Sequence, residues 1–198
     1  ILLAKSLEST GEKEAAINVL IETEKYLSDF SRTSEPRSYL PEINFHLGHL
    51  YQQTDKNNEA YNSYRSLHIF YPTHELTQLA KIEMNRLVTK QLDINIKPLT
   101  INEHAQRINK LLKDVQYHQV VIEITELLKK NPLLPEKFYF YLAKAHKGLR
   151  KRNLANAALR KFLKHYPQHE RVQEALFVIG RNLWNTGYYI DGLKYFKK

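Results

Sequence analysis

Cysteine, glycine and proline are scarce in this sequence, and each scarcity excludes a class of protein. The 198-residue chain has no cysteine, which excludes disulfides and thiolate chemistry and leaves the redox compartment unassigned. With 6 Gly and 7 Pro, it has too few turn-forming residues for an all-β sandwich or barrel. No stretch approaches the roughly 18 uncharged apolar residues of a membrane span. Apolar residues nevertheless make up 42% of the chain, which is enough to bury a core.

Positive charge is unevenly distributed along the chain. Residues 1–98 contain 11 basic and 13 acidic residues, a net charge of −2. Residues 99–198 contain 19 basic and 8 acidic residues, a net charge of +11. The basicity therefore belongs to the second half, and an argument from the overall charge of +9 would mislead.

A pattern of small and apolar residues recurs at fixed offsets. Gly48 is followed at offsets 3, 12, 16, 19 and 24 by Tyr51, Ala60, Tyr64, Leu67 and Pro72. Ala143 is followed at the same offsets by His146, Ala155, Leu159, Phe162 and Pro167. A third series with all five offsets starts at Ile108, and shorter series start at Ala4 and Gly180. Self-similarity of this kind is typical of helical repeat arrays.

The offsets are those of two helices joined by a short turn. Each half of the pattern places its small and apolar residues on one helical face, and a small residue on each helix permits a close antiparallel crossing. The turns, such as those at 55–58 and 185–187, are rich in Asp, Asn and Gly. One hairpin cannot bury its apolar face, but stacked hairpins can. The sequence therefore predicts an all-α solenoid of antiparallel helix pairs.

These residues resemble the tetratricopeptide repeat family. The matching segments are 45–51 with 60–72, 141–144 with 155–167, and 178–181 with 187–189. The resemblance implies a right-handed superhelix whose concave groove binds a peptide or a partner protein. The repeat starts are separated by 44, 60, 35 and 37 residues, where a regular array gives about 34. Ile108 and Val120 replace the small residues of the third pair, so we expect that pair to cross more widely.

The excess length suggests two groups of hairpins. A polar loop at 28–37 separates the first two repeats. Residues 76–88 have the pattern of an unpaired helix, and residues 93–98 that of an extended break. We predict N-terminal hairpins at 1–90, a joint at 91–101 and basic C-terminal hairpins at 102–198; one continuous superhelix with a long insertion is the alternative. The chain begins without Met and ends within a helical pattern, so we expect it to be part of a longer protein.

No catalytic, cofactor or metal motif is present in the sequence. It lacks a Gly-rich phosphate loop and a His-Glu-x-x-His motif, so we predict no catalytic residues, cofactor or metal for this chain. His46 and His49 are three residues apart on one predicted helix, but no carboxylate in register would complete a metal site. We interpret His49 as facing the groove and His46 as facing solvent.

A basic cluster in the second half has two interpretations. It comprises Lys144, Lys147, Arg150, Lys151, Arg152, Arg160, Lys161 and Lys164. One interpretation is a solvated helix–turn–helix surface. The other is an electropositive patch for an acidic peptide, an anionic glycan such as peptidoglycan, or nucleic acid. Nucleic acid is disfavoured, because the neighbouring aromatic residues fall on core positions rather than between the charges.

The repeat register predicts which side chains line the groove. Positions three before, one after and four after the small residue should face the concave wall. They are Phe45, His49 and Gln52 in the second repeat, Phe140, Lys144 and Lys147 in the fourth, and Phe177, Arg181 and Trp184 in the fifth. Aromatic and Arg residues of this kind are enriched in binding hot spots. For Trp184, a core position is the open alternative.

Two functional hypotheses follow from the sequence. The first is a non-catalytic binding or scaffold module that takes a peptide or a partner protein in its concave groove. The second rests on segments 161–167 and 175–184, which look like the α-superhelical region of soluble lytic murein transglycosylases. That resemblance implies an accessory role in the periplasm or cell envelope, with peptidoglycan as the substrate and catalysis outside this chain. The family's catalytic Glu-Ser segment has no counterpart here, because Glu8-Ser9 lacks its context.

Overall fold

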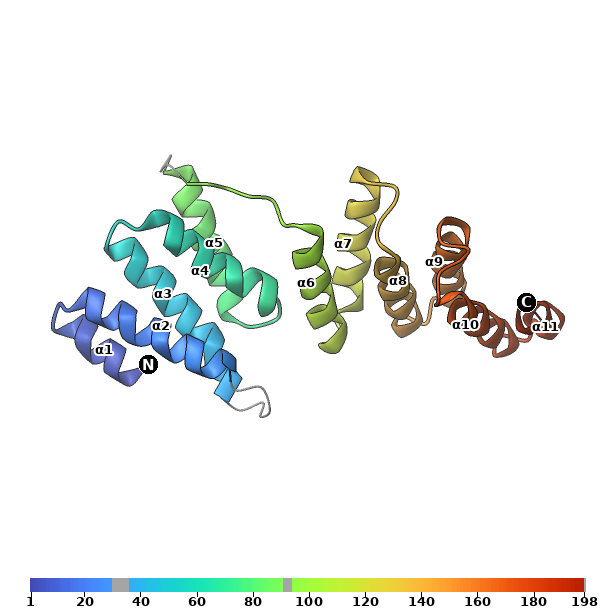
Figure 1. Cartoon of the computed structure of the whole chain (residues 1–198), viewed down its shortest axis with the longest axis horizontal. Coiled ribbons are helices and arrows are strands. Elements are labelled where there is room, and N and C mark those ends of the chain that lie inside the picture. Colours follow the sequence, from blue (N-terminus) through green and yellow to red (C-terminus); the bar gives the residue numbers. More distant parts are fainter. Residues whose placement is uncertain (30–35, 91–93, 198) are drawn as a thin grey trace. The chain divides into compact units, whose positions relative to one another are not determined.

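The computed structural model describes residues 1–29, 36–90 and 94–197, and within them all regular structure is helical. The helices are α1 (Leu2–Ser9), α2 (Lys13–Asp29), a 3-10 turn η1 (Pro36–Tyr39), α3 (Leu40–Gln53), α4 (Asn57–Phe70), α5 (Leu76–Thr89), α6 (Ile101–Lys113), α7 (Tyr117–Lys130), α8 (Glu136–Gly148), α9 (Arg152–His165), α10 (Val172–Trp184) and α11 (Tyr189–Phe196) (Figure 1). The prediction of an all-α fold is confirmed. Most of the predicted polar loop at 28–37 lies outside the described residues.

Four of the five predicted helix pairs pack as antiparallel neighbours, as the repeat offsets predict. The wider crossing expected for the third pair stays a prediction. The pairs α1–α2, α3–α4, α8–α9 and α10–α11 have extensive contacts, and α2–α3, α4–α5, α7–α8 and α9–α10 pack between pairs. Figure 1 shows these neighbours side by side. The chain divides into two compact units, residues 1–107 and 108–198, which we call unit 1 and unit 2. The division lies within α6, beyond the predicted joint at 91–101.

One turn geometry recurs at all five repeat starts. The residue seven positions after each start has a left-handed backbone, with φ between 59° and 86°; these residues are Gly11, Asp55, Val115, Arg150 and Gly187. The next residue donates its backbone N–H to the carbonyl three positions after the start, as from Lys56 to Tyr51 and from Lys151 to His146. This is the helix-terminating pattern that glycine most often adopts. The fixed spacing in the sequence therefore reflects a repeated helix stop.

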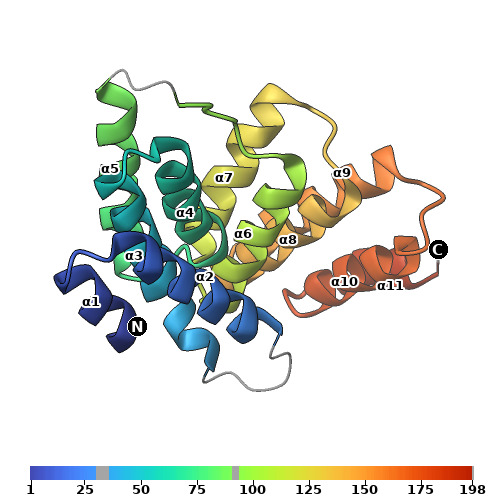
Figure 2. The same ribbon diagram turned by 60° about the vertical axis from the view of Figure 1, so that its left-hand side comes forward.

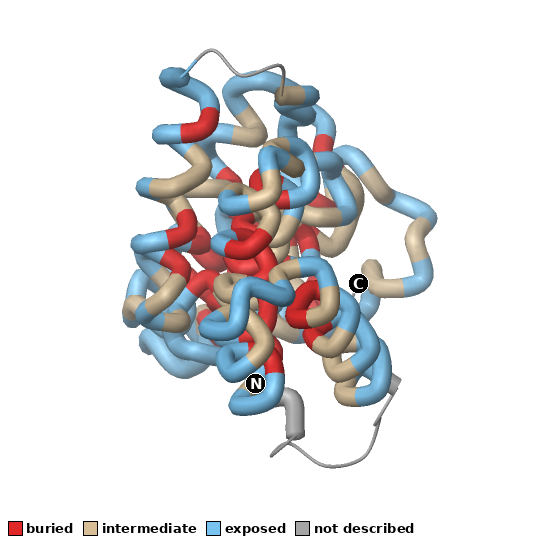
Figure 3. The backbone as a smooth tube through the Cα atoms, turned by 90° about the vertical axis from the view of Figure 1, so that its left-hand side faces the viewer, coloured by how far each residue is buried: buried red, intermediate tan, exposed pale blue. Residues whose placement is uncertain are grey.

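Unit 1 has its core at the shared faces of α1–α5. One cluster of buried residues joins α1, α2 and α3 and includes Ala4, Ala16 and Leu47. A second joins α4 and α5 through Tyr64, Ala80 and other residues. In Figure 3, the buried segments of the tube lie where helices face one another. The small side chains of the repeat pattern therefore lie in the interior, as their offsets from the repeat start predict.

The core of unit 2 contains large aromatic rings as well as small residues. Phe138, Tyr139 and Phe162 are at most 2% exposed, and Phe162 stacks on Tyr166 with ring centroids 5.8 Å apart. The Tyr166 hydroxyl donates a hydrogen bond of 2.8 Å to the carbonyl oxygen of Leu134. Burial of a large apolar side chain stabilises a fold by about 1.5–3 kcal/mol. Core packing therefore accounts for these aromatic residues of unit 2, whereas others, such as Phe177 and Tyr188, are exposed.

Helix α5 is not unpaired, which corrects one sequence prediction. It packs against α4 and also touches α3, with Ala80 fully buried and Leu87 2% exposed. Figure 2 shows α5 lying beside α3 and α4. The apolar pattern at 76–88 predicted the helix correctly. It did not contain the small residues at repeat offsets from which a packing partner could have been inferred. A helix can pack on the preceding hairpin without forming a hairpin of its own.

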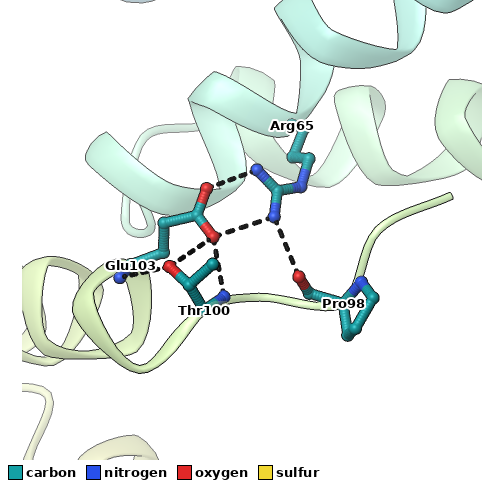
Figure 4. Close-up of polar contacts among 4 residues, drawn as sticks. All are labelled: Arg65, Pro98, Thr100 and Glu103. Carbon is teal, nitrogen blue, oxygen red and sulfur yellow. Dashed lines mark hydrogen bonds and ion pairs between the residues drawn. The ribbon is translucent and has the colours of Figure 1, made fainter. Parts of the chain in front are cut away.

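An ion pair ties the start of α6 to α4. The described part of the predicted extended break, 94–98, is non-helical, as are residues 99 and 100. Arg65 donates hydrogen bonds of 2.5 and 3.0 Å to the Glu103 carboxylate and one of 3.3 Å to the carbonyl oxygen of Pro98 (Figure 4). Glu103 also accepts a 2.7 Å bond from the backbone N–H of Thr100, and its own N–H donates to the Thr100 hydroxyl. This reciprocal capping box, which a Thr-x-x-Glu sequence favours, starts α6.

Candidate functional site

A concave site on unit 2 brings together four of the nine predicted groove residues. It has a volume of about 390 Å³ and lies over α8, α9 and α10. We call it the basic cleft. It is lined by Phe140, Tyr141, Ala143, Lys144, Lys147, Ala155, Leu159, Arg171, Glu174, Val178, Arg181 and Asn182. The cleft follows from the close helix crossing, because the two small residues Ala143 and Ala155 form part of its floor.

One wall of the basic cleft is a rigid stack of Arg171 on Phe140. The Arg171 guanidinium carbon lies 3.6 Å from the centroid of the Phe140 ring, whose edge packs on Phe162 at 4.8 Å. Arg171 also donates hydrogen bonds of 2.7 and 3.1 Å to the Glu174 carboxylate. These bonds lower the pKa of Glu174 below its usual value. Cation–π stacking and the paired hydrogen bonds together hold Arg171 in place.

The remaining cations of the cleft have no carboxylate partner. Among the described residues, Lys144, Lys147 and Arg181 make no ion pair. All three are exposed, and the Arg181 guanidinium carbon lies 5.6 Å from the centroid of the Phe177 ring. Glu174 is the one acidic residue among those that line the cleft, and Arg171 neutralises it. The residues that line the cleft therefore carry a net positive formal charge.

A buried amide pair supports the floor of the cleft. The Asn182 side-chain amide donates a hydrogen bond of 2.8 Å to the Asn156 side-chain oxygen, and each residue is 2% exposed. The pair joins α9 to α10. Sequence reasoning missed Arg171, Glu174 and Asn182 as cleft residues. For Glu174 a signal existed, since it lies one helical turn before Phe177 on the same face.

Two further predicted residues line a separate apolar pocket between α10 and α11. Its lining residues are Phe177, Arg181, Trp184, Leu193 and Phe196, and its volume is about 350 Å³. We call it the C-terminal apolar pocket. The open question about Trp184 is answered by its exposure of 44%: the residue lies at the surface and not in the core. Arg181 lines both this pocket and the basic cleft.

The predicted groove residues of the second repeat lie in unit 1. Phe45 and His49 line a concavity of about 420 Å³ that also contains Glu8, Glu42, Glu75 and Lys5. Gln52 does not line it; its side-chain oxygen accepts a hydrogen bond of 2.8 Å from the Tyr64 hydroxyl. This concavity carries more carboxylates than amines, the reverse of the basic cleft.

The interpretation of His46 as solvent-facing is wrong. His46 is half-buried and lines the unit 1 concavity together with His49. Its burial lowers the pKa of the imidazole below the usual value. The two imidazoles share the concavity because residues three apart on a helix are neighbours. No group of three or more His, Asp or Glu suited to a metal ion occurs in the part of the chain that the structure describes.

The predicted basic cluster divides between different surfaces of unit 2. Lys144 and Lys147 line the basic cleft, whereas Arg150–Arg152 surround a polar hollow at the turn between α8 and α9. Arg160 donates a hydrogen bond of 3.0 Å to the Tyr195 hydroxyl. Lys161 and Lys164 are exposed on α9. The cluster therefore does not form one continuous surface, because two of its residues line a cleft and others lie on exposed surfaces. Binding of an anionic partner stays a prediction.

Comparisons with known proteins agree with the repeat register. Residues 138–169 and residues 41–67 each match a model of the tetratricopeptide repeat. The helix pairs α8–α9 and α3–α4 are thus similar to tetratricopeptide repeats, the family that their sequence resembles. No curated protein matches the sequence significantly. None of the described helices has the combined length and apolar character needed to cross a membrane.

The solved structures that match this chain share little sequence with it. A crystal structure of MamA is 14% identical, with 98% of this chain and 90% of that chain covered and a TM-score of 0.48. MamA residues 41 to the end, from Desulfovibrio magneticus RS-1, are also 14% identical, with 98% and 88% covered and a TM-score of 0.47. The TPR2AB-domain:pHSP90 complex of yeast Sti1 is 16% identical, with 97% and 72% covered and a TM-score of 0.43.

Proposed function

We propose that this chain is a non-catalytic protein-binding module whose basic cleft takes an acidic segment of a partner protein. The observation that carries the proposal is the set of three cations, Lys144, Lys147 and Arg181, that face one concavity without carboxylate partners among the described residues. Carboxylates of a bound peptide would supply those partners. Charge-assisted hydrogen bonds are roughly twice as strong as neutral ones.

Two further features of the cleft favour peptide binding, namely side chains that are already ordered and an apolar floor. Arg171 and Phe140 are already fixed by their stacking, so little side-chain freedom is lost when a ligand contacts them. The floor residues Ala143 and Leu159 offer an apolar base for the peptide backbone. The unit 1 concavity, with Glu8, Glu42 and Glu75, lacks the positive charge that an acidic segment requires. The proposal therefore places acidic-segment binding in unit 2.

A binding experiment with a matched charge control tests the proposal. The probe is a fluorescein-labelled 12-residue peptide with alternating Glu, Asp, Ser and Gly, followed by fluorescence anisotropy. We expect the double variant Lys144→Ala/Lys147→Ala to weaken binding at least tenfold, which corresponds to about 1.4 kcal/mol. The control is Lys161→Ala/Lys164→Ala, which removes the same charge from the exposed surface of α9.

The control separates a specific site from general attraction to a basic unit. A loss below threefold in the control, beside a tenfold loss in the cleft variant, supports the cleft. Equal losses in both double variants would show that the peptide senses only net charge, and the proposal would then be wrong. The accessory role in a transglycosylase and the periplasmic location stay predictions from the resemblance of segments 161–167 and 175–184 alone.

A further inference from the structure

The C-terminal apolar pocket lies directly beside the basic cleft. Phe177, Arg181 and Trp184 occupy successive turns on one face of α10, and Leu193 and Phe196 on α11 complete the pocket. Arg181 belongs to the lining of both sites. A chain segment that passes over Arg181 would therefore meet cations on one side and apolar side chains on the other.

The side chains that line the pocket expose a large apolar surface to solvent. Phe177, Trp184, Leu193 and Phe196 are 55%, 44%, 44% and 42% exposed. Scattered apolar residues on a surface need no explanation, but four that line one hollow form a contiguous patch. Large apolar and aromatic side chains in such a hollow are the usual anchors of a protein interface.

Close packing of α10 on α11 fixes the shape of the pocket before any ligand is present. A Cβ atom on Gly192 would lie 3.0 Å from the carbonyl oxygen of Gly180, and one on Gly180 would lie 2.6 Å from the Phe196 ring. The two glycines thus let Phe196 approach α10, where its ring centroid is 5.8 Å from that of Phe177. Trp184 rests edge-on against Tyr189 at 4.9 Å. A preformed pocket binds with less loss of side-chain freedom.

We propose that the C-terminal apolar pocket binds a large apolar side chain of the same acidic segment that occupies the basic cleft. This inference rests on the proposed function, and it specifies the ligand as an acidic segment with one aliphatic or aromatic anchor. Charge complementarity supports this occupant. The five lining residues include a cation, Arg181, and no carboxylate. A second copy of unit 2 is the less favourable occupant, because residues 108–198 hold 18 basic and 7 acidic residues and would repel it.

Trp184 provides a direct readout because it is the single tryptophan of the chain. Two unlabelled peptides serve as probes: the acidic 12-residue peptide with one internal Leu, and the same peptide with Ser in that position. Calorimetry should show that the Leu peptide binds at least fivefold more tightly. Trp184 emission, excited at 295 nm, should shift to shorter wavelength with the Leu peptide and should not shift with the Ser peptide.

A matched pair of substitutions on α11 locates the effect. Leu193→Ser should abolish the advantage of the Leu peptide, because Leu193 lines the pocket. Ile190→Ser is the control: Ile190 lies one turn earlier on α11, is 75% exposed and does not line the pocket, so the advantage should persist. Circular dichroism checks that both variants fold, and the two-peptide comparison on the unsubstituted chain does not depend on either variant.

The possible results separate this inference from the function on which it rests. If the Leu and Ser peptides bind equally and both require Lys144 and Lys147, the anchor assignment is wrong while the basic cleft stands. If neither peptide binds, the proposed function fails and the anchor with it. A shift in Trp184 emission that depends on protein concentration alone, with sedimentation showing dimers, would assign the pocket to a second copy and overturn the inference.

Discussion

The α-carbon of Gly48 on α3 lies against the ring of Tyr64 on α4, and a methyl group on Gly48 would overlap the ring. Tyr64 is fully buried and packs on Phe45 with ring centroids 5.6 Å apart. Its hydroxyl donates a hydrogen bond to the side-chain oxygen of Gln52. The pair Gly180 and Phe196 repeats this relationship in unit 2. In both pairs the absence of a side chain on one helix makes room for an aromatic ring on the other.

Substitution of Gly48 by Ala should therefore destabilise unit 1. Alanine favours a helix interior over glycine by about 1 kcal/mol, but overpacking of a core costs about 1–3 kcal/mol. We expect a net loss of up to about 2 kcal/mol in the free energy of unfolding, measured by urea denaturation. In a Tyr64→Leu background the loss should shrink or reverse. An equal loss in both backgrounds would disconnect Gly48 from the Tyr64 ring.

Val115→Gly should stabilise the protein. Val115 has φ of 61° and is 63% exposed, so it adopts the left-handed conformation without packing to compensate. That conformation costs an L-residue roughly 1–2 kcal/mol, and glycine avoids this cost. Glycine loses more backbone entropy on folding, which offsets about 0.5–1 kcal/mol of the gain. We expect a gain of about 0.5–1 kcal/mol in thermal denaturation. Gly187→Ala is the converse control, because its φ is 86° and the space beside it is open, so only backbone strain should lower the stability.

Asn182→Ala should destabilise unit 2 by about 1–3 kcal/mol, because it leaves the buried Asn156 oxygen without its hydrogen bond. The double variant Asn156→Leu/Asn182→Leu tests the reason. Replacing both partners by apolar groups can be nearly neutral, so the double variant should be more stable than Asn182→Ala. Chemical denaturation followed by circular dichroism measures both. A double variant as unstable as the single one would show that the polar pair itself is needed.

Acid should weaken the link between α4 and α6. Hydrogen bonds from Arg65 and Thr100 lower the pKa of Glu103 from 4.5 to about 2. A carboxyl group with a lowered pKa stabilises the folded state above pH 4.5, and this contribution is lost as the pH falls from about 4.5 to about 2. The difference in the free energy of unfolding between the unsubstituted chain and Glu103→Gln should therefore shrink as the pH falls over that range. Arg65→Met should remove the same pH-dependent difference, and a difference that stays constant down to pH 2.5 would contradict the assignment.

Salt should distinguish the two parts of the proposed ligand. Ionic strength screens exposed charges, since the Debye length falls from about 10 Å at 0.1 M to about 3 Å at 1 M. The affinity of the acidic Ser peptide should therefore fall at least tenfold between 0.05 and 0.5 M NaCl. The ratio of the Leu to the Ser peptide affinities should stay nearly constant, because apolar burial is not screened. Anisotropy measured across the salt series checks both expectations.

Sequence by itself determined the repeat. The offsets from Gly48 and Ala143 predicted the helix pairs, because helical periodicity is a local property of the chain. The left-handed residue at offset 7 became visible only in the structure, since Val115 and Arg150 carry no turn signal in the sequence. The tertiary structure decided which side chains meet. It placed Arg171 over Phe140, buried Asn182 against Asn156, packed α5 on α4 and brought His46 into the concavity with His49. These contacts depend on how neighbouring helices cross and where loops end, and side-chain spacing within one helix does not fix either.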